Sequence, residues 1–356
     1  MVWYLLLALT PLLLAPLVSY GYNSPIDTNK DAKRTYLIMC GLILFLMIAL
    51  RHYSLGSIDS AGYYNNWITM RETPYSSLGY ALQDSDMEPG YLFTVWCLSR
   101  VFPSAQFVFV LTGLLFSIAI CRVVYLNSDN VMISMIMCIC LGLYMFLIQG
   151  LRQGIAISIC LLAIESCKRR RFIRFLLLVI LASFFHRTAL VFILVYFVYG
   201  FMLSNQTKAA MAVSVAVLIV LSPVIVEYGN ELLDRDYFGT VESGAVVAVM
   251  TYAIIAAAAI LLLNQHNTEK KDAFFVWLLI FGMSFYLMRY FGAQAMERIS
   301  FYFLIGQAIV LPTAVNKLEH KSRNITYLAV CLLSIALFFY RLNASYGLNY
   351  MFFWEG

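Results

Sequence analysis

The chain has few charged residues and lacks any long hydrophilic stretch. Asp, Glu, Lys and Arg make up 12% of its 356 residues, whereas soluble domains carry about 25%. Hydrophobic residues make up 62%. The longest hydrophilic stretch, 51–89, is too short and too aromatic to form its own core. The sequence therefore excludes a soluble domain and predicts an all-α, polytopic integral membrane protein.

Sequence patterns typical of metal sites, disulfide frameworks and nucleic-acid binding are also missing. None of the eight Cys forms a C-x-x-C pair, and the four His lie far apart, so neither a zinc site nor a set of disulfides is expected. The net charge of +5 comes from basic residues scattered over loops, which does not favour a nucleic-acid partner. Residues 1–20 lack a basic region and a clear cleavage site, so they are interpreted as a retained first helix.

Long apolar runs dominate what is present. A spanning helix needs about 20 apolar residues. Two regions, 90–102 and 172–203, do not fit one simple span, because the first is too short and the second is interrupted. The clear candidate spans are 2–20, 35–50, 106–125, 131–148, 152–167, 209–226, 245–263, 273–291, 299–316 and 325–341.

The distribution of basic residues predicts the topology. The loop "CKRRRFIRF" (167–175) should be cytoplasmic under the positive-inside rule. For the later loops to stay consistent, 172–203 must begin and end inside, as a hairpin of two short helices that turns near His186 and Arg187. By the same reasoning, 51–105 is a periplasmic loop whose part 90–102 is a re-entrant or interfacial helix. The prediction is one transmembrane domain, 1–356, with about twelve crossings.

This topology places only Arg, and no Lys, among the basic residues outside. The planar guanidinium binds phosphate and carboxylate groups through two parallel hydrogen bonds, which the Lys ammonium cannot do. Arg also reaches well from helix ends to the membrane surface. We nevertheless expect several of these residues to form an anion site on the outer face: Arg51, Arg71, Arg100, Arg152, Arg187, Arg235, Arg289, Arg298 and Arg341.

Several short outer motifs each have a functional and an ordinary explanation. Glu88, before Pro89, fits a site acid or a simple helix-start acid. In "QGLRQGIA" (149–156), Arg152 would lie at a helix N-terminus that favours anions, or the glycines would serve only helix packing. His186 suits proton transfer near neutral pH, although a lone His at a helix end is more often structural.

Taken in order, these motifs resemble the EpsG family, the Wzy-type polymerases of bacterial surface polysaccharides. The resemblance spans about residues 45–300. One departure is that the family's usual Gly-Thr-Asp-Tyr reads here as Gly56-Ser57-Ile58-Asp59-Ser60. The matching patterns are Arg51 with the Gly56–Asp59–Tyr63 turn, Glu88-Pro89-Gly90-Tyr91, Leu151-Arg152-Gln153-Gly154-Ile155-Ala156, Phe185-His186 followed by Thr188-Ala189-Leu190, and Glu297-Arg298.

The resemblance implies a GT-C-like glycosyltransferase in the bacterial inner membrane with its active site facing the periplasm. It would transfer a growing glycan from undecaprenyl pyrophosphate to a new lipid-linked repeat unit, without a metal or other cofactor; a chain-length regulator is a further candidate partner. His186, Asp59 or Glu88 would accept a proton. Arg51, Arg152, Arg187, Arg289 and Arg298 would bind the pyrophosphate, and Gln153, Tyr63, Tyr91 and Glu297 the rest of the substrate.

Two other functions stay open from the sequence. A lipid-linked oligosaccharide flippase would have a similar composition, but transport sites lie near the bilayer midplane between repeats, and no internal repeat is visible here. A membrane O-acyltransferase would also use a His and several Arg, but its acyl donor enters from the cytoplasm. The predicted position of the Arg residues at the outer helix ends favours the polymerase over the flippase, and the predicted outer location of His186 favours it over the acyltransferase.

Overall fold

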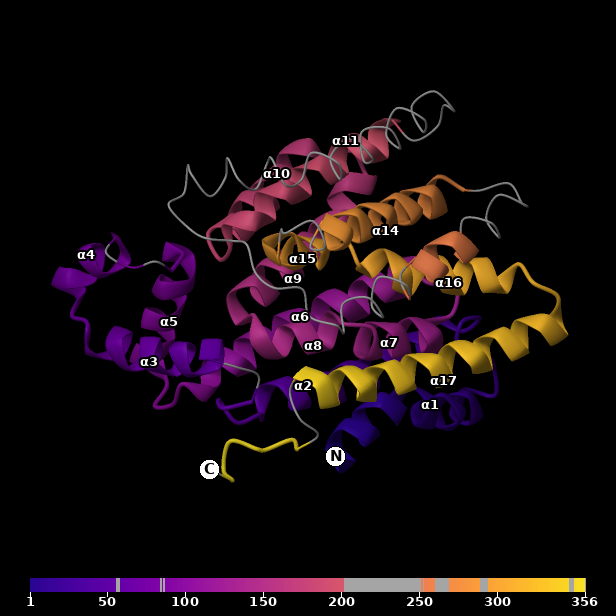
Figure 1. Cartoon of the computed structure of the whole chain (residues 1–356), viewed down its shortest axis with the longest axis horizontal. Helices are drawn as coiled ribbons and strands as arrows, with labels where there is room; N and C mark the ends of the chain where they lie inside the picture. Colours follow the sequence, from indigo (N-terminus) through magenta and orange to yellow (C-terminus); the bar gives the residue numbers. More distant parts are fainter. Residues whose placement is uncertain are drawn as a thin grey trace. The chain divides into compact units, whose positions relative to one another are not determined.

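A computed structural model describes residues 1–55, 58–83, 85, 87–201, 251, 253–259, 269–288, 294–345 and 349–355. Over these residues the backbone is helical, apart from turns and one isolated antiparallel bridge between Arg51 and Phe352. The predicted all-α fold is confirmed. The helices (Figure 1) are α1 Val2–Tyr22, α2 Lys30–Ala49, α3 Ile58–Glu72, η1 Tyr75–Ser77, α4 Leu78–Gln83, α5 Pro89–Val101, α6 Gln106–Asn127, α7 Val131–Cys140, α8 Leu143–Gln149, α9 Leu151–Lys168, α10 Phe172–Ser183, η2 Arg187–Ile193, α11 Leu194–Phe201, α14 Lys270–Met288, α15 Gln294–Ser300, α16 Ile305–Asn316 and α17 His320–Ser345.

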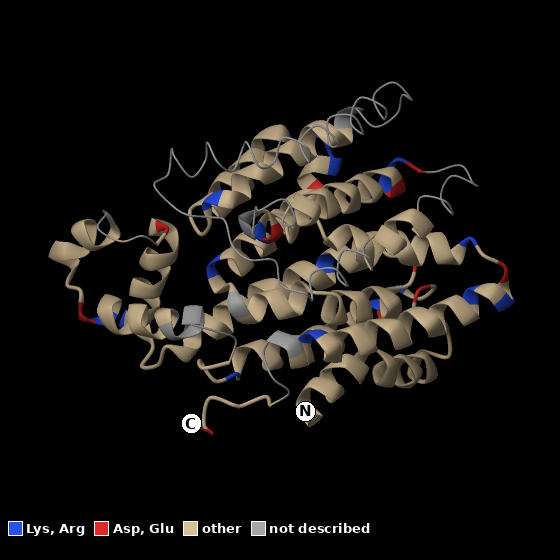
Figure 2. Cartoon of the chain, viewed as in Figure 1, with Lys and Arg blue, Asp and Glu red and all other residues tan. Residues whose placement is uncertain are grey.

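Among the described helices, α1, α2, α6, α14 and α17 are long and apolar enough to cross a membrane, and α7, α10 and α16 are shorter apolar helices. Lys and Arg lie mostly towards helix ends and loops (Figure 2). The chain is thus compatible with a multi-pass membrane protein. The twelve crossings and the sides of the loops stay predictions. The predicted span 209–226 and most of 245–263 lie outside the described residues.

Two of the predicted spans are interrupted. The run 131–148 divides into α7 and α8 because Gly142 has a φ of 110°, a left-handed conformation that glycine adopts without steric cost. The run 299–316 contains a turn between the end of α15 and the start of α16. Both interruptions lie inside continuous apolar sequence, where hydrophobicity alone gives no signal for a break.

The chain divides into two compact units, which are described separately. The first comprises residues 1–126, 131–190 and 331–356; the second comprises 127–130 and 191–330. In the first unit, α1 packs against α2 and α7, α9 packs against α10, and the shorter α3 and α5 pack against each other (Figure 1).

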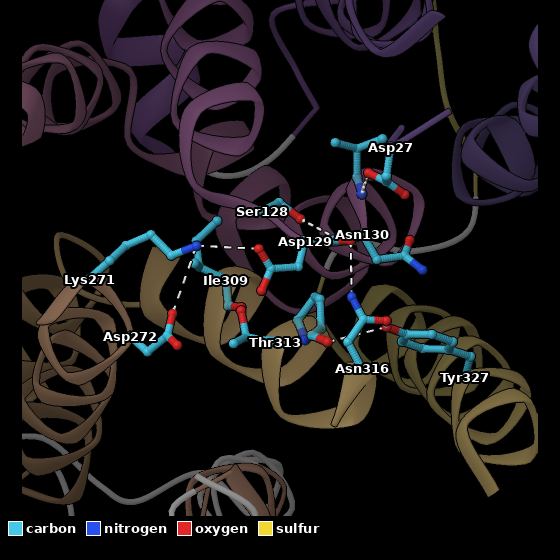
Figure 3. A network of polar contacts seen from close by, with 12 residues as sticks. Asp27, Ser128, Asp129, Asn130, Lys271, Asp272, Ile309, Thr313, Asn316 and Tyr327 are labelled. Carbon is cyan, nitrogen blue, oxygen red and sulfur yellow. Dashed lines mark hydrogen bonds and ion pairs between the residues drawn. The ribbon is translucent and has the colours of Figure 1, made fainter. Parts of the chain in front are cut away.

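In the second unit, α14 packs against α15 and α16. Polar contacts fix the turn at 127–130 to these helices (Figure 3). The Asp129 carboxylate forms an ion pair with Lys271 at 3.2 Å, and its backbone carbonyl accepts a hydrogen bond from Asn316 at 3.0 Å. The Tyr327 hydroxyl in turn donates to the Asn316 side chain at 2.7 Å. Because several partners converge on one turn, the end of α16 has a defined position within this unit.

The two regions that do not fit one simple span are helical but short. α5 covers the segment predicted to be re-entrant, and α10 ends at Ser183, three residues before His186. A new helical segment, η2, begins at Arg187. The chain therefore breaks at the predicted turn. Whether 172–203 is an antiparallel hairpin stays a prediction, because α10 and α11 belong to different units.

Candidate functional site

The Glu88 carboxylate lies at the centre of a polar cluster in the first unit. Glu88 is the N-cap residue of α5, with Pro89 at the first helical position, where proline is well tolerated. Its side chain does not cap the helix. One oxygen forms an ion pair with Arg152, and the other accepts from His186 Nδ1 at 2.8 Å. The Arg187 backbone N–H lies 3.4 Å from that second oxygen. Glu88 thus joins α5, α9 and the turn after α10.

A close backbone contact next to Glu88 fixes this geometry. The Gly90 N–H donates to the Phe184 carbonyl at 3.0 Å. A Cβ atom at Gly90 would lie 2.7 Å from both the Cβ and the carbonyl oxygen of Phe184. Only glycine allows the start of α5 to approach the 184–186 turn this closely. The Pro-Gly pair after Glu88 therefore positions Glu88 opposite His186.

Arg152 lies in the first turn of α9 and makes two contacts inside the cluster. Besides the ion pair with Glu88, its guanidinium hydrogen-bonds the Tyr63 side chain on α3. Its Nε atom is buried and makes no hydrogen bond to any described residue. The side chain as a whole is 22% exposed. Arg152 is held in place and still has an unused donor.

Two tyrosines form one wall of the cluster. Tyr63 on α3 and Tyr91 on α5 are both buried, and their ring centroids are 5.6 Å apart at an angle of 62°, an edge-to-face arrangement that aromatic rings prefer. The Tyr91 hydroxyl is buried without a hydrogen-bond partner among the described residues. An unpaired buried hydroxyl is costly, so a ligand or water would stabilise this wall.

The surroundings of Glu88 determine how its side chain ionises. Burial by itself would raise the pKa, but the hydrogen bond with His186 and the charges of Arg152 and His186 lower the pKa of Glu88 to about 2. An ionised carboxylate only accepts hydrogen bonds, so His186 must carry its hydrogen on Nδ1. In neutral His186, Nε2 is then the atom with a free lone pair, and it makes no hydrogen bond within the described part of the chain.

Arg51 is fully buried beside this cluster but is held by different neighbours. It lies two residues after the end of α2, donates to the Leu55 carbonyl and places its guanidinium 4.5 Å from the Phe109 ring centroid. Its Nε and Nη2 atoms have no hydrogen-bond partner among the described residues. Burial lowers the pKa of Arg51 to about 10, with smaller opposing effects from tyrosines that include Tyr144 and Tyr63. Among the residues of the cluster, Tyr63 interacts electrostatically with Arg51.

The predicted site residues therefore fall into distinct groups. Glu88, Arg152, His186, Tyr63 and Tyr91 come together, from segments that are distant in the sequence. Gln153 is buried in the position after Arg152, and the Arg187 side chain is exposed beside the cluster.

The other predicted residues are not part of the described cluster. Asp59 lies at the start of α3, but its side chain is outside the described residues, as is Arg289. Glu297 and Arg298 are on α15 in the second unit. Their proposed proximity to Arg152 stays a prediction.

The link between these motifs is not visible in the sequence. The sequence identified Glu88 as either a base or a helix-start acid, but the carboxylate binds the two other key side chains of the cluster. It also gave no role to Phe184, whose carbonyl receives the Gly90 N–H. The one available signal was the glycine directly after Glu88-Pro89, which indicates a close backbone approach.

Comparison with known families identifies the family of the chain. The model of the EpsG family matches residues 34–354, a range that includes every residue of the cluster. No curated protein and no solved structure gives a match to the chain. Because the family match covers nearly the whole sequence, the chain belongs to the EpsG family.

Proposed function

We propose that the chain is a membrane polysaccharide polymerase that works on the periplasmic side of a bacterial inner membrane. It takes a growing glycan from undecaprenyl pyrophosphate and transfers it to the terminal sugar of a new lipid-linked repeat unit, without a metal ion. The family match supports a polymerase-type activity. The contacts of Glu88 support a transfer that needs both a base and a fixed cation.

In this proposal His186 is the base. The hydroxyl oxygen of the acceptor sugar attacks the anomeric carbon of the donor, the bond from that carbon to the pyrophosphate oxygen breaks, and the hydroxyl proton moves to His186 Nε2. Glu88 holds the ring through Nδ1, which fixes the tautomer and stabilises the imidazolium that forms. A carboxylate with a pKa near 2 is too weak a base for this step at neutral pH, which favours His186 over Glu88.

Arg152 and Arg187 supply the positive charge for the leaving group. Pyrophosphate gains negative charge as the glycosidic bond breaks, and a guanidinium that is already oriented stabilises that charge without having to reorganise. Arg152 is oriented by Glu88 and Tyr63 and retains an unused Nε donor. The exposed Arg187 side chain is adjacent to the base and free to reach a phosphate.

One observation carries the proposal: a single carboxylate orients both a histidine and an arginine. The first leaves a proton-accepting nitrogen and the second an unused cationic donor. A polar network used only for packing would be expected to satisfy its buried donors. Transfer from a lipid pyrophosphate needs a base for the hydroxyl proton and a fixed cation for the leaving group, and the cluster provides both.

The test is the surface-polysaccharide ladder of a strain that lacks this gene, complemented with matched variants of equal membrane abundance. Arg152→Ala and His186→Ala should leave a single repeat unit. Arg122→Ala and His320→Ala, which change exposed residues on α6 and α17, should restore the ladder.

Other results would assign the chain differently. If repeat units accumulate without reaching the outer side, the chain is a flippase. If the deletion strain keeps its ladder and loses only an ester substituent, it is an O-acyltransferase. If both site variants restore full ladders, the cluster at Glu88 is not the active site.

A further inference from the structure

A cleft lies in the first unit, between one face of α3 and the turn that joins α5 to α6. It has a volume of about 480 Å³, within the range of about 300–1,000 Å³ that is usual for small-molecule sites. Neither α3 nor α5 is among the helices that could span a membrane. The cleft is lined by Tyr64, Trp67, Ile68, Arg71 and Glu72 from α3, and by Pro103, Ser104 and Ala105 from the turn.

The α3 residues of this cleft recur at helical spacing, so they form one continuous stripe. Trp67 is buried at its base, and Tyr64 is 39% exposed and stacks on Tyr53 with centroids 4.8 Å apart. Two aromatic rings thus line a surface that also carries a carboxylate and a guanidinium. Aromatic side chains that combine an apolar body with a polar tip are well suited to ligands that are both polar and apolar.

The walls of the cleft are held by hydrogen bonds within the protein. Arg71 Nη1 donates to the Pro103 carbonyl at 2.8 Å, and Arg100 Nη1 donates to the Arg71 carbonyl at 3.1 Å. The Trp96 indole N–H donates to the Thr73 carbonyl at 3.0 Å. These contacts tie the end of α3 to α5 and to the turn. The cleft is therefore formed before any ligand arrives, as is usual for binding sites.

The charges of the cleft restrict what it can bind. Glu72 is exposed, and its carboxylate makes no hydrogen bond or ion pair with any described residue. The other nitrogens of Arg71 make no hydrogen bond with any described residue. An anion such as pyrophosphate would meet the Glu72 charge. A lipid chain would have to desolvate both charged groups. An uncharged ligand with several hydroxyls can instead donate to Glu72 and accept from Arg71.

We infer that this cleft is a subsite for an uncharged pyranose unit of a glycan. The sugar ring lies against Tyr64 and Trp67, while neighbouring hydroxyls bind Glu72 and Arg71. The inference rests on the proposed function, because it assigns part of the glycan substrate to this cleft. Tyr63 and Tyr64 are consecutive on α3, and Trp67 in the cleft lies one helical turn after Tyr63, so the cleft and the Glu88 cluster lie on neighbouring faces of one helix. The subsite would hold the glycan beyond the reacting sugar.

The experiment is saturation-transfer NMR on the full chain in detergent with methyl glycosides of glucose, galactose, mannose and N-acetylglucosamine, and with inorganic pyrophosphate as competitor. At least one glycoside should bind, and pyrophosphate should not displace it. Glu72→Gln should weaken this binding about tenfold, the usual effect of losing one hydrogen bond to a charged group. Tyr64→Ala should weaken it comparably.

Matched controls are Glu319→Gln and Tyr75→Ala, which change exposed residues outside the cleft and should bind the glycoside as the wild type does. The inference is overturned if no glycoside binds the wild type, if both cleft variants bind normally, or if pyrophosphate displaces the sugar. None of these binding results decides the polymerase function, which the polysaccharide ladder tests separately. An intact ladder in the deletion strain would instead remove the polymerase function while sugar binding at the cleft stands.

Discussion

At the scale of single residues, the Glu88 carboxylate joins the chemistry of the site to its architecture. It accepts from His186 and from Arg152, whose Cα atoms belong to different segments of the first unit. Loss of this one side chain would free the imidazole to rotate and leave the half-buried Arg152 side chain with one fewer partner. Both consequences follow from the same two contacts, so a single substitution tests them together.

Glu88→Gln should reduce polymer formation by about 100-fold or more. Glu88 orients the base His186, and this is the contribution that a well-placed base makes. The neutral amide no longer favours the Nδ1–H tautomer of His186 and loses the ion pair with Arg152. The measurement is the polymerisation rate in membranes at equal protein abundance. Glu165→Gln, which breaks the Lys168–Glu165 ion pair in the same unit, should retain near-normal activity. If both variants lose the same activity, the loss of any ion pair lowers the polymerisation rate, and Glu88 has no specific role.

The lowered pKa of Glu88 predicts how stability depends on pH. The pKa of Glu88 falls from the ordinary value of 4.5 to about 2 in the folded chain. Ionised Glu88 therefore stabilises the folded state by about 3 kcal/mol. This contribution is complete above about pH 4.5 and is lost as pH falls towards 2. Thermal unfolding in detergent should therefore show a smaller decrease in Tm over this window for Glu88→Gln than for the wild type. Parallel curves would contradict the lowered pKa.

At the scale of secondary-structure elements, glycines decide how closely helices and turns approach. Gly90 brings α5 against the 184–186 turn, and Gly142 ends α7 so that α8 can start in a new direction. Each position is specified by geometry: a backbone contact in the first case and a positive φ in the second. Periodicity identifies the apolar helices but carries no information on either requirement.

Gly90→Ala should destabilise the chain by about 1–3 kcal/mol, the usual cost of overfilling a packed site. The new methyl group would lie 2.7 Å from the Phe184 backbone, so α5 and Glu88 must move away from His186. Thermal unfolding and the polysaccharide ladder should both be impaired.

Gly62→Ala is the matched control on α3, because nothing lies within 4 Å of the added methyl group. Alanine favours the helix by about 1 kcal/mol over glycine, so this variant should be at least as stable as the wild type. An equally harmful Gly62→Ala would mean that glycine flexibility, and not the contact with Phe184, is what matters.

At the scale of the whole molecule, the topology depends on the short helix α10. Its 12 residues extend about 18 Å, compared with about 30 Å for the hydrocarbon core. The basic loop before it is predicted to be cytoplasmic, and the His186 cluster after it is predicted to face outwards. An 18 Å helix can separate these two sides only if the turn after it opens into a space accessible to water. That space is where the lipid pyrophosphate would enter.

Thiol labelling tests this arrangement. Arg171→Cys replaces the exposed N-cap residue of α10, and Arg187→Cys replaces the exposed first residue of η2, beyond the turn that follows α10. Most native cysteines are buried, so background labelling should be low. A membrane-impermeant maleimide should modify position 187 in intact spheroplasts and position 171 only after permeabilisation. Labelling of both positions from one side would contradict a crossing by α10.

The sequence by itself determined that this is an all-α membrane protein, because composition and long apolar runs report directly on the solvent that surrounds each helix. It also supplied the family and the identities of Glu88, Arg152 and His186, because short polar motifs stand out against apolar sequence. Only the tertiary structure decided that Glu88 binds both other residues, that α7 and α8 are separate, and that α3 forms a cleft with the α5–α6 turn. Such contacts join residues far apart in the chain, and local patterns describe what each residue is but not which distant residue it meets.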